Sequence, residues 1–271
     1  MLRPTLPNIL ILGAALTVAA VPSLAQDTGG LLDTLSDVIS DAPAGSDERA
    51  ELTGRIIQII ALFTVLSIAP GLLVVMTSFT RFVIVFSILR SALGLNQTPP
   101  NMVLSAMALF MTFFVMQPVL EDSWENGLEP LLENSITEQQ AVERIGGPFK
   151  SFMFANTRPK DLALFQGIAA RSEGRDTVEP YETAQEASWR SLVPAFMISE
   201  LRRAFTIGFL IYLPFVAIDL IVASILMSAG MMMLPPVLVS LPFKVIFFVL
   251  IDGWYMVAGS MMESYLAPLG G

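Results

Sequence analysis

Long stretches without a charged side chain limit most strongly what this chain can fold into. No residue from 56 to 80 is charged, and residues 204–243 contain a single charge, Asp219. A helix that spans a membrane needs about 20 predominantly apolar residues, and both stretches exceed that length. Across the whole sequence 54% of residues are hydrophobic and 14% are charged, unlike a typical soluble domain. The sequence therefore predicts an all-α integral membrane protein.

The N-terminus has the pattern of a cleavable secretory signal peptide. Arg3 is the only charge before an apolar run over residues 9–21, and Ser23-Leu24-Ala25 supplies small residues for a cleavage site. The run is short for a membrane span, although an uncleaved anchor is the alternative. We expect a signal peptide over 1–25 that is cleaved after Ala25, followed by an acidic, flexible leader over 26–54.

Turn-forming residues and changes in composition divide the remaining chain into three segments. Residues 55–120 contain two predicted spans, the first over 56–80. Residues 121–203 are rich in charged side chains and predict a small extramembrane, periplasmic helical segment. Residues 204–271 predict two apolar helices joined near 230–236. The predicted architecture is two bent apolar helical hairpins, with about four membrane-region helices, flanking the small helical domain.

Prolines and capping residues predict where helices begin and bend. Pro99-Pro100 precedes the second predicted span, and Pro214 and Pro242 are candidate breaks in the last segment. In the polar segment, Ser135 or Thr137 can cap a helix start. A following helix is expected to place Leu162, Phe165 and Ile168 or Ala169 on one apolar face.

The arginines conflict with a simple arrangement of lipid-facing spans. A cleaved signal and four spans would place Arg81 and Arg90 on the cytoplasmic side, as the positive-inside rule favours. The same arrangement leaves Arg202 and Arg203 on the outer side, next to the third span. We therefore expect helices that are covered partly by protein.

The residue types that are absent exclude several classes of function. The chain contains no cysteine and no histidine, which removes disulfides, thiol nucleophiles, histidine bases and nearly all transition-metal sites. The net charge of −9 disfavours nucleic acid as a partner. No phosphate-binding glycine loop or catalytic constellation is present in the sequence. We expect a protein that is not an enzyme and has no cofactor and no metal.

Asp219 and Lys244 are expected to form a pair across a hairpin. Asp219 lies 12 residues before Met231, and Lys244 lies 11 residues after Met233. With a helical rise of about 1.5 Å per residue, both lie about 18 Å from the turn. A charge at that depth normally faces a partner or a water-filled cavity. The pair is either a structural tie that fixes the hairpin register or a proton or ion relay.

Glu200 and two phenylalanines of the polar segment each allow two interpretations. Glu200 shares a helix face with Arg203, which favours a solvated helix start, but it could instead reach Lys244 of a neighbouring chain. Phe152 and Phe165 belong to an aromatic cluster that forms either the core of the small domain or an exposed contact surface.

Three consecutive methionines precede Pro235-Pro236 within the sequence "SAGMMMLPPV". Three successive side chains cannot all point to one packed face of a regular helix. The symmetric spacing of Asp219 and Lys244 around the methionines predicts that they form the tip of the hairpin.

Three blocks of the sequence resemble one protein family. They read "GLLVVMTSFTRFVIVFSILRSALGLNQTPPNMVLSAMALFMTFFVMQP", "FMFANTRPKDLALF" and "FMISELRRAFTIGFLIYLPFVAIDLIVASILMSAGMMMLPPVLVSLPFKVIFFVLIDGW". On these blocks the chain resembles the FliP family of flagellar export-gate proteins, and the homologous R component of virulence-type type III secretion systems. The resemblance covers essentially everything after about Leu52, apart from parts of residues 172–186.

The resemblance implies partners and a location. Family members form the export gate with FliQ and FliR, with five copies of the FliP-family subunit in a helical cone, next to FlhB and FlhA. The cone consists of bent hairpins, and much of it lies above the plane of the inner membrane. This implies a place in the bacterial inner membrane, within the flagellar basal body, with a large periplasmic-side portion. The implied substrates are unfolded flagellar proteins.

The resemblance also implies roles for individual residues. They are a pore gasket of Met231, Met232 and Met233, a constriction of Phe152 and Phe165, and membrane-region charges at Glu200, Asp219 and Lys244. Flexible thioethers can close around a pore, and an apolar constriction blocks ions. The expected function is a pore-forming core subunit that lets unfolded flagellar proteins cross the membrane and seals the channel at rest. The alternative is a proton- or solute-coupled transporter that uses Asp219 and Lys244, although the internal repeats usual in transporters are not apparent.

Overall fold

The computed structural model describes residues 67, 71–72, 74–95, 97–174, 181–231 and 233–266 of the 271-residue chain. The expected signal peptide with Ala25, the acidic leader, most of the first predicted span and Met232 lie outside the described residues. The chain divides into two units, Met1–Leu72 and Leu73–Gly271. The description below concerns the second unit.

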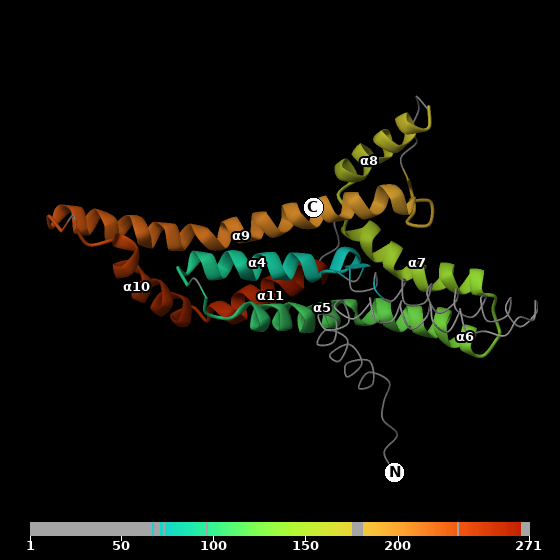
Figure 1. Cartoon of the computed structure of the whole chain (residues 1–271), viewed down its shortest axis with the longest axis horizontal. Helices are drawn as coiled ribbons and strands as arrows, with labels where there is room; N and C mark the ends of the chain where they lie inside the picture. Colours follow the sequence, from blue (N-terminus) through green and yellow to red (C-terminus); the bar gives the residue numbers. More distant parts are fainter. Residues whose placement is uncertain are drawn as a thin grey trace, which may run out of the picture. The chain divides into compact units, whose positions relative to one another are not determined.

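All regular elements among the described residues of this unit are helices (Figure 1). In chain order they are α4 (Phe79–Ala92), α5 (Asn101–Ser123), the π-helix η1 (Trp124–Leu128), α6 (Glu129–Leu132), α7 (Glu138–Asn156), α8 (Pro159–Ser172), α9 (Trp189–Ser228), α10 (Pro236–Leu250) and α11 (Gly253–Leu266). The all-α prediction is confirmed for this part of the chain.

Two described helices are long and apolar enough to cross a membrane, namely Asn101–Leu132 and Trp189–Ser228. The helices α10 and α11 are long and apolar enough only when taken together, and the 61° bend between them fits either a broken span or a re-entrant loop. The 40-residue α9 begins at Trp189 and continues through residue 204, the predicted start of the last segment. At about 1.5 Å per residue α9 is about 60 Å long, about twice the thickness of the hydrocarbon core. The helix is therefore longer than one crossing of the hydrocarbon requires.

The helix start predicted at Pro99-Pro100 is confirmed, since α5 begins at Asn101, but the candidate breaks at Pro214 and Pro242 are wrong. Pro214 lies inside α9 and Pro242 lies inside α10, and neither interrupts its helix. A proline removes one backbone donor, and apolar helices tolerate this loss when neighbouring groups cover the freed carbonyl. The interruption lies instead between the end of α10 at Leu250 and the start of α11 at Gly253, where Asp252 has a φ of 51°.

A helix-ending motif and a Pro-Pro step form the predicted turn between α9 and α10. Gly230 has a φ of 69°, and the amides of Gly230 and Met231 donate to the carbonyls of Met227 and Leu226 at 3.1 and 3.0 Å. This pair of bonds is a Schellman motif, which favours glycine because of the left-handed conformation. Since α10 begins at Pro236, the prediction of a turn at the methionines is confirmed.

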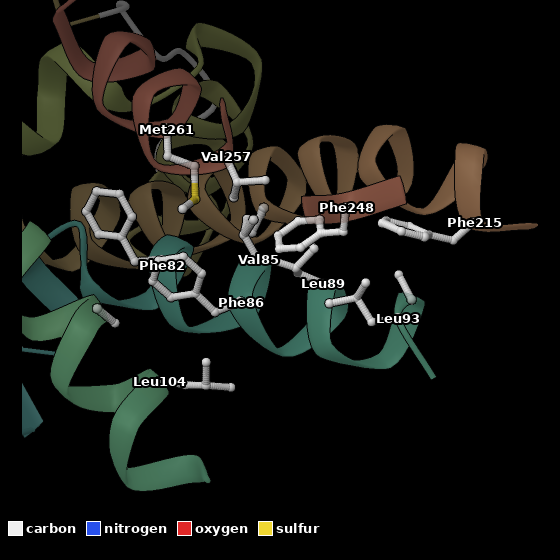
Figure 2. Close-up of a cluster of buried hydrophobic side chains, with 13 residues drawn as sticks. Phe82, Val85, Phe86, Leu89, Leu93, Leu104, Phe215, Phe248, Val257 and Met261 are labelled. Atoms are coloured by element: carbon white, nitrogen blue, oxygen red, sulfur yellow. The ribbon is translucent and has the colours of Figure 1, made fainter. Parts of the chain in front are cut away.

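One face of α4 provides the centre of the larger core. The buried residues Phe82, Val85, Phe86 and Leu89 recur at helical spacing. Figure 2 shows them facing side chains from the C-terminal helices, among them Phe248. The helix α4 packs along α9 and against α5.

A smaller core joins α7, α8 and α9. Its buried members include Met153, Leu162, Leu192 and Phe196. Thr137 caps α7 in a reciprocal capping box with Gln140, so one of the two expected caps is confirmed. The expected apolar face of α8 is partly wrong. The buried residues of α8 are Leu162, Gln166 and Ala170, and Ile168 is exposed.

Candidate functional site

A buried ion pair joins α4 to α9. Arg81 and Glu200 are separated by 119 positions in the sequence, and both side chains have an exposed fraction of 0%. The Arg81 Nε–H donates to Glu200 Oε2 at 2.8 Å, and Arg81 Nη2 donates to Glu200 Oε1. Such a two-point contact is the strongest geometry for an arginine and a carboxylate. The interpretation of Glu200 as a solvated helix start is therefore wrong.

Residues of α11 complete the surroundings of this pair. Arg81 Nη1 donates to Ser264 Oγ at 2.8 Å, and the Tyr265 hydroxyl donates to Glu200 Oε2 at 2.6 Å. The Tyr265 ring centroid lies 3.7 Å from Arg81 Cζ, which is a cation–π contact. Glu200 thus pairs with residues of its own chain. The alternative from the sequence was a pair with Lys244 of a neighbouring chain.

Arg203 lies near the same pair but contacts α7. Its Nη1 is 3.5 Å from Asn156 Oδ1. In the adjacent turn, Ser199 Oγ–H donates to Asp161 Oδ2 at 2.7 Å and accepts from the Arg158 backbone amide at 3.1 Å. The junction between α7 and α8 is therefore fixed to α9 by polar contacts within one turn of Glu200.

The second charge pair ties the α9–α10 hairpin to the end of α4. Lys244 Nζ donates to Asp219 Oδ2 at 2.6 Å and to the carbonyl of Ala92 at 3.2 Å. The Ser240 hydroxyl donates to Asp219 Oδ1 at 2.5 Å. Ala92 is the last residue of α4, where unpaired carbonyls attract a cation. The pairing of Asp219 with Lys244, which we expected from their spacing, is present within one chain.

Met231 and Met233, the two described methionines of the turn, are exposed. The exposed fraction is 46% for Met231 and 98% for Met233. The adjacent residues Leu234, Val237 and Leu238 are also exposed. The tip of the hairpin therefore presents an apolar surface that the described part of the chain does not bury.

The two phenylalanines of the expected constriction are half-buried against other residues of the chain. Phe152 lies edge-on to Phe196 at 6.0 Å between ring centroids, and it stacks on Tyr265 at 5.9 Å with an angle of 20° between ring planes. Phe165 is half-buried against the smaller core. Both rings belong to the interface where α7 and α8 meet α9, which is the first of the two interpretations of this cluster.

The described residues contain no group of three or more acidic side chains that could hold a metal ion. Arg81 and Glu200 each contact an opposite charge and a hydroxyl. This arrangement supports positioning and packing.

A family model described as the FliP family matches residues 62–261 of the chain. The chain belongs to the FliP family. The flagellar biosynthetic protein FliP of Agrobacterium fabrum is 58% identical over 210 residues, which cover 78% of this chain and 84% of that protein. The FliP of Rhizobium meliloti is 56% identical over 211 residues, covering 78% and 84%. The FliP of Bacillus subtilis is 46% identical over 220 residues, covering 81% and 96%.

Three members of the buried cluster are not predicted from the sequence as part of it. Arg81 enters the sequence analysis only through the positive-inside rule, and Ser264 and Tyr265 do not enter it. A signal for Arg81 was present, because an arginine followed at once by another apolar helix needs a partner in the protein. No sequence signal indicated Tyr265, since its role depends on the bend that returns α11 toward α4.

Proposed function

We propose that this FliP-family chain is a pore-forming core subunit of the flagellar type III protein export gate. The observation that carries the proposal is the exposure of Met231 and Met233 at the tip of an apolar hairpin. Three soft side chains at a tip need apolar partners to leave water, and copies of the subunit around one axis would supply them. The ring of methionines would close the channel at rest and repack around varied unfolded chains.

The proposed assembly contains several copies of the subunit together with FliQ and FliR, next to FlhB and FlhA. The proposed location is the bacterial inner membrane within the flagellar basal body. A periplasmic-side portion is supported by the length of α9, which exceeds the hydrocarbon core. In this proposal Phe152 and Phe165 border the channel from the α7–α8 segment, and Glu200, Asp219 and Lys244 serve assembly. The closed contacts of Asp219 with Ser240 and Lys244 favour a structural tie over a proton relay.

Replacing Met231, Met232 and Met233 together with alanine tests the seal. We expect cells that carry this variant to leak small solutes across the inner membrane while export of flagellar proteins largely continues. The leak is measured with a membrane-potential dye, and export is measured from the flagellar proteins in the medium. Replacement of the same three residues with leucine keeps the apolar bulk and should leak less. Met256→Ala, at an exposed position of α11, is the control outside the turn.

Unchanged permeability of the alanine variant, at normal amounts of the assembled complex, would contradict the seal. Loss of the complex in the same variant would instead assign the methionines to assembly.

A further inference from the structure

One tyrosine of α11 contacts both the buried ion pair and a residue of the proposed constriction. The Tyr265 hydroxyl donates to Glu200 Oε2 at 2.6 Å, and its ring centroid lies 3.7 Å from Arg81 Cζ. The same ring stacks on Phe152 at 5.9 Å between centroids. This side chain therefore joins α7 to the ion pair between α4 and α9.

We propose that Tyr265 is the positioning residue for Phe152, and that α11 thereby sets the geometry of the constriction. The inference rests on the proposed function, because that function assigns Phe152 to the channel. It goes beyond that function in two ways. It names Tyr265, outside the channel, as the residue that sets the position of the Phe152 ring, and it names α11 as the helix that positions Tyr265.

The anchor of Tyr265 is rigid. Arg81 and Glu200 are both fully buried, and their two-point contact leaves the carboxylate with one fixed orientation. A hydroxyl bonded to this carboxylate fixes how deeply the tyrosine lies, and the cation–π contact fixes the plane of its ring. Phe82 lies beside the ring at 5.7 Å between centroids. Three contacts consequently fix the tyrosine: Glu200 at its hydroxyl, Arg81 over its ring and Phe82 beside its ring.

The position of Phe152 follows from that of Tyr265. The Phe152 ring is nearly parallel to the Tyr265 ring, with 20° between their planes, and its other aromatic neighbour is Phe196 at 6.0 Å. Stacked rings lose dispersion contacts steeply as they separate. A displacement of Tyr265 therefore either moves Phe152 with it or leaves a void beside it.

The helix α11 is attached at both ends, so its orientation sets where the tyrosine lies. At its C-terminal end Ser264 accepts a bond of 2.8 Å from Arg81 Nη1. At its N-terminal end Trp254 lies edge-on to Phe248 at 5.3 Å, next to the 61° bend. Rotation about this bend would carry Tyr265 away from Glu200 and release the ring of Phe152.

A double-mutant cycle on the complete gate in cells tests the coupling. The variants are Phe152→Leu, Tyr265→Leu and the pair of both, read by the resting leak and by export. If Tyr265 acts through Phe152, each single change raises the leak, and the double variant leaks no more than the stronger single variant. Leaks that multiply in the double variant would overturn the proposal. Tyr255→Leu, at an exposed position of α11, should leave the leak unchanged.

The conservative variant Tyr265→Phe isolates the hydroxyl. It keeps the stacked ring but removes the bond to Glu200, and one hydrogen bond to a charged group shifts an equilibrium by about ten- to a hundredfold. We expect a raised leak at normal amounts of the complex. A fluorine-labelled phenylalanine at position 152 of the purified complex should change its fluorine NMR shift in Tyr265→Phe and keep it in Tyr255→Phe.

The two measurements separate this inference from the proposed function. If Phe152→Leu changes neither leak nor export, the assignment of Phe152 to the constriction fails, and the fluorine shift still decides whether Tyr265 positions the ring. An unchanged fluorine shift in Tyr265→Phe overturns the inference, whatever the leak.

Discussion

Single residues show how an apolar helical chain keeps charged groups in its interior. Arg81 and Glu200 are fully buried, and burial of an isolated ionised group costs several kcal/mol. The cost is offset because the carboxylate accepts three bonds and the guanidinium donates to both Glu200 and Ser264. Replacing only Arg81 or only Glu200 should therefore destabilise the protein far more than replacing both.

Arg81→Met should lower the free energy of unfolding by about 3–5 kcal/mol, because Glu200 is then buried without its cation. The measurement is the thermal transition of the detergent-solubilised complex, together with its yield. The double variant Arg81→Met/Glu200→Leu removes both charges and should recover most of the loss. Equal destabilisation in the single and double variants would show that packing, not charge, matters at this position.

The sequence predicted one ion pair and missed the other, for a physical reason. Asp219 and Lys244 are equally distant from a turn, and their contact follows from helix geometry alone. Arg81 and Glu200 belong to different segments, and no local rule relates residues 119 positions apart. Counting along a chain finds partners within a hairpin, whereas partners between hairpins depend on how the helices pack.

At the level of the helices, glycine and aspartate predict the bend better than proline does. Pro214 and Pro242 lie within continuous helices, while the Asp252-Gly253 step ends one helix and begins the next. A Cβ atom at Gly253 would lie 2.1 Å from Phe248 Cε2. The close approach of α11 to the Phe248 ring therefore requires a residue without a side chain.

Gly253→Ala should destabilise the protein by about 1–3 kcal/mol, since the added methyl group displaces a packed aromatic ring. Gly259→Ala on the same helix is the matched control, because a Cβ there meets no atom within 4 Å. That control should be neutral or slightly stabilising, as alanine favours a helix by up to about 1 kcal/mol over glycine. Thermal transitions of the two variants in detergent give the comparison. Similar transitions for both would mean that α11 shifts easily to accommodate the methyl group.

For the whole molecule, exposed apolar surface is the dominant property. Large apolar side chains are exposed along α9, among them Phe205, Phe209, Leu213, Ile221 and Ile225. Contiguous apolar surface of this kind marks contacts with protein or lipid. The class of the fold was predictable from composition and the lengths of apolar stretches. The surface that each partner covers was not predictable from the sequence. A helix that is apolar on all sides has no single apolar face that its periodicity could indicate.

Extraction in mild detergent followed by mass measurement tests the proposed assembly. We expect a complex that contains several copies of this chain and other membrane subunits. Lys244→Met removes the tie between Asp219 and the end of α4, and it should reduce the recovery of that complex. A chain that is always recovered as a monomer or small homodimer, without other subunits, would contradict the export-gate proposal.

The length of α9 has a consequence for the life of the protein in the cell. One lipid bilayer is too thin to cover the full length of the 40-residue α9, so a newly made subunit without neighbours presents surface that quality-control proteases recognise. Copies made in excess of their partners should be short-lived. The amount of this subunit in the cell would then follow the amount of its least abundant partner subunit. Degradation of unassembled copies would balance the synthesis of the components.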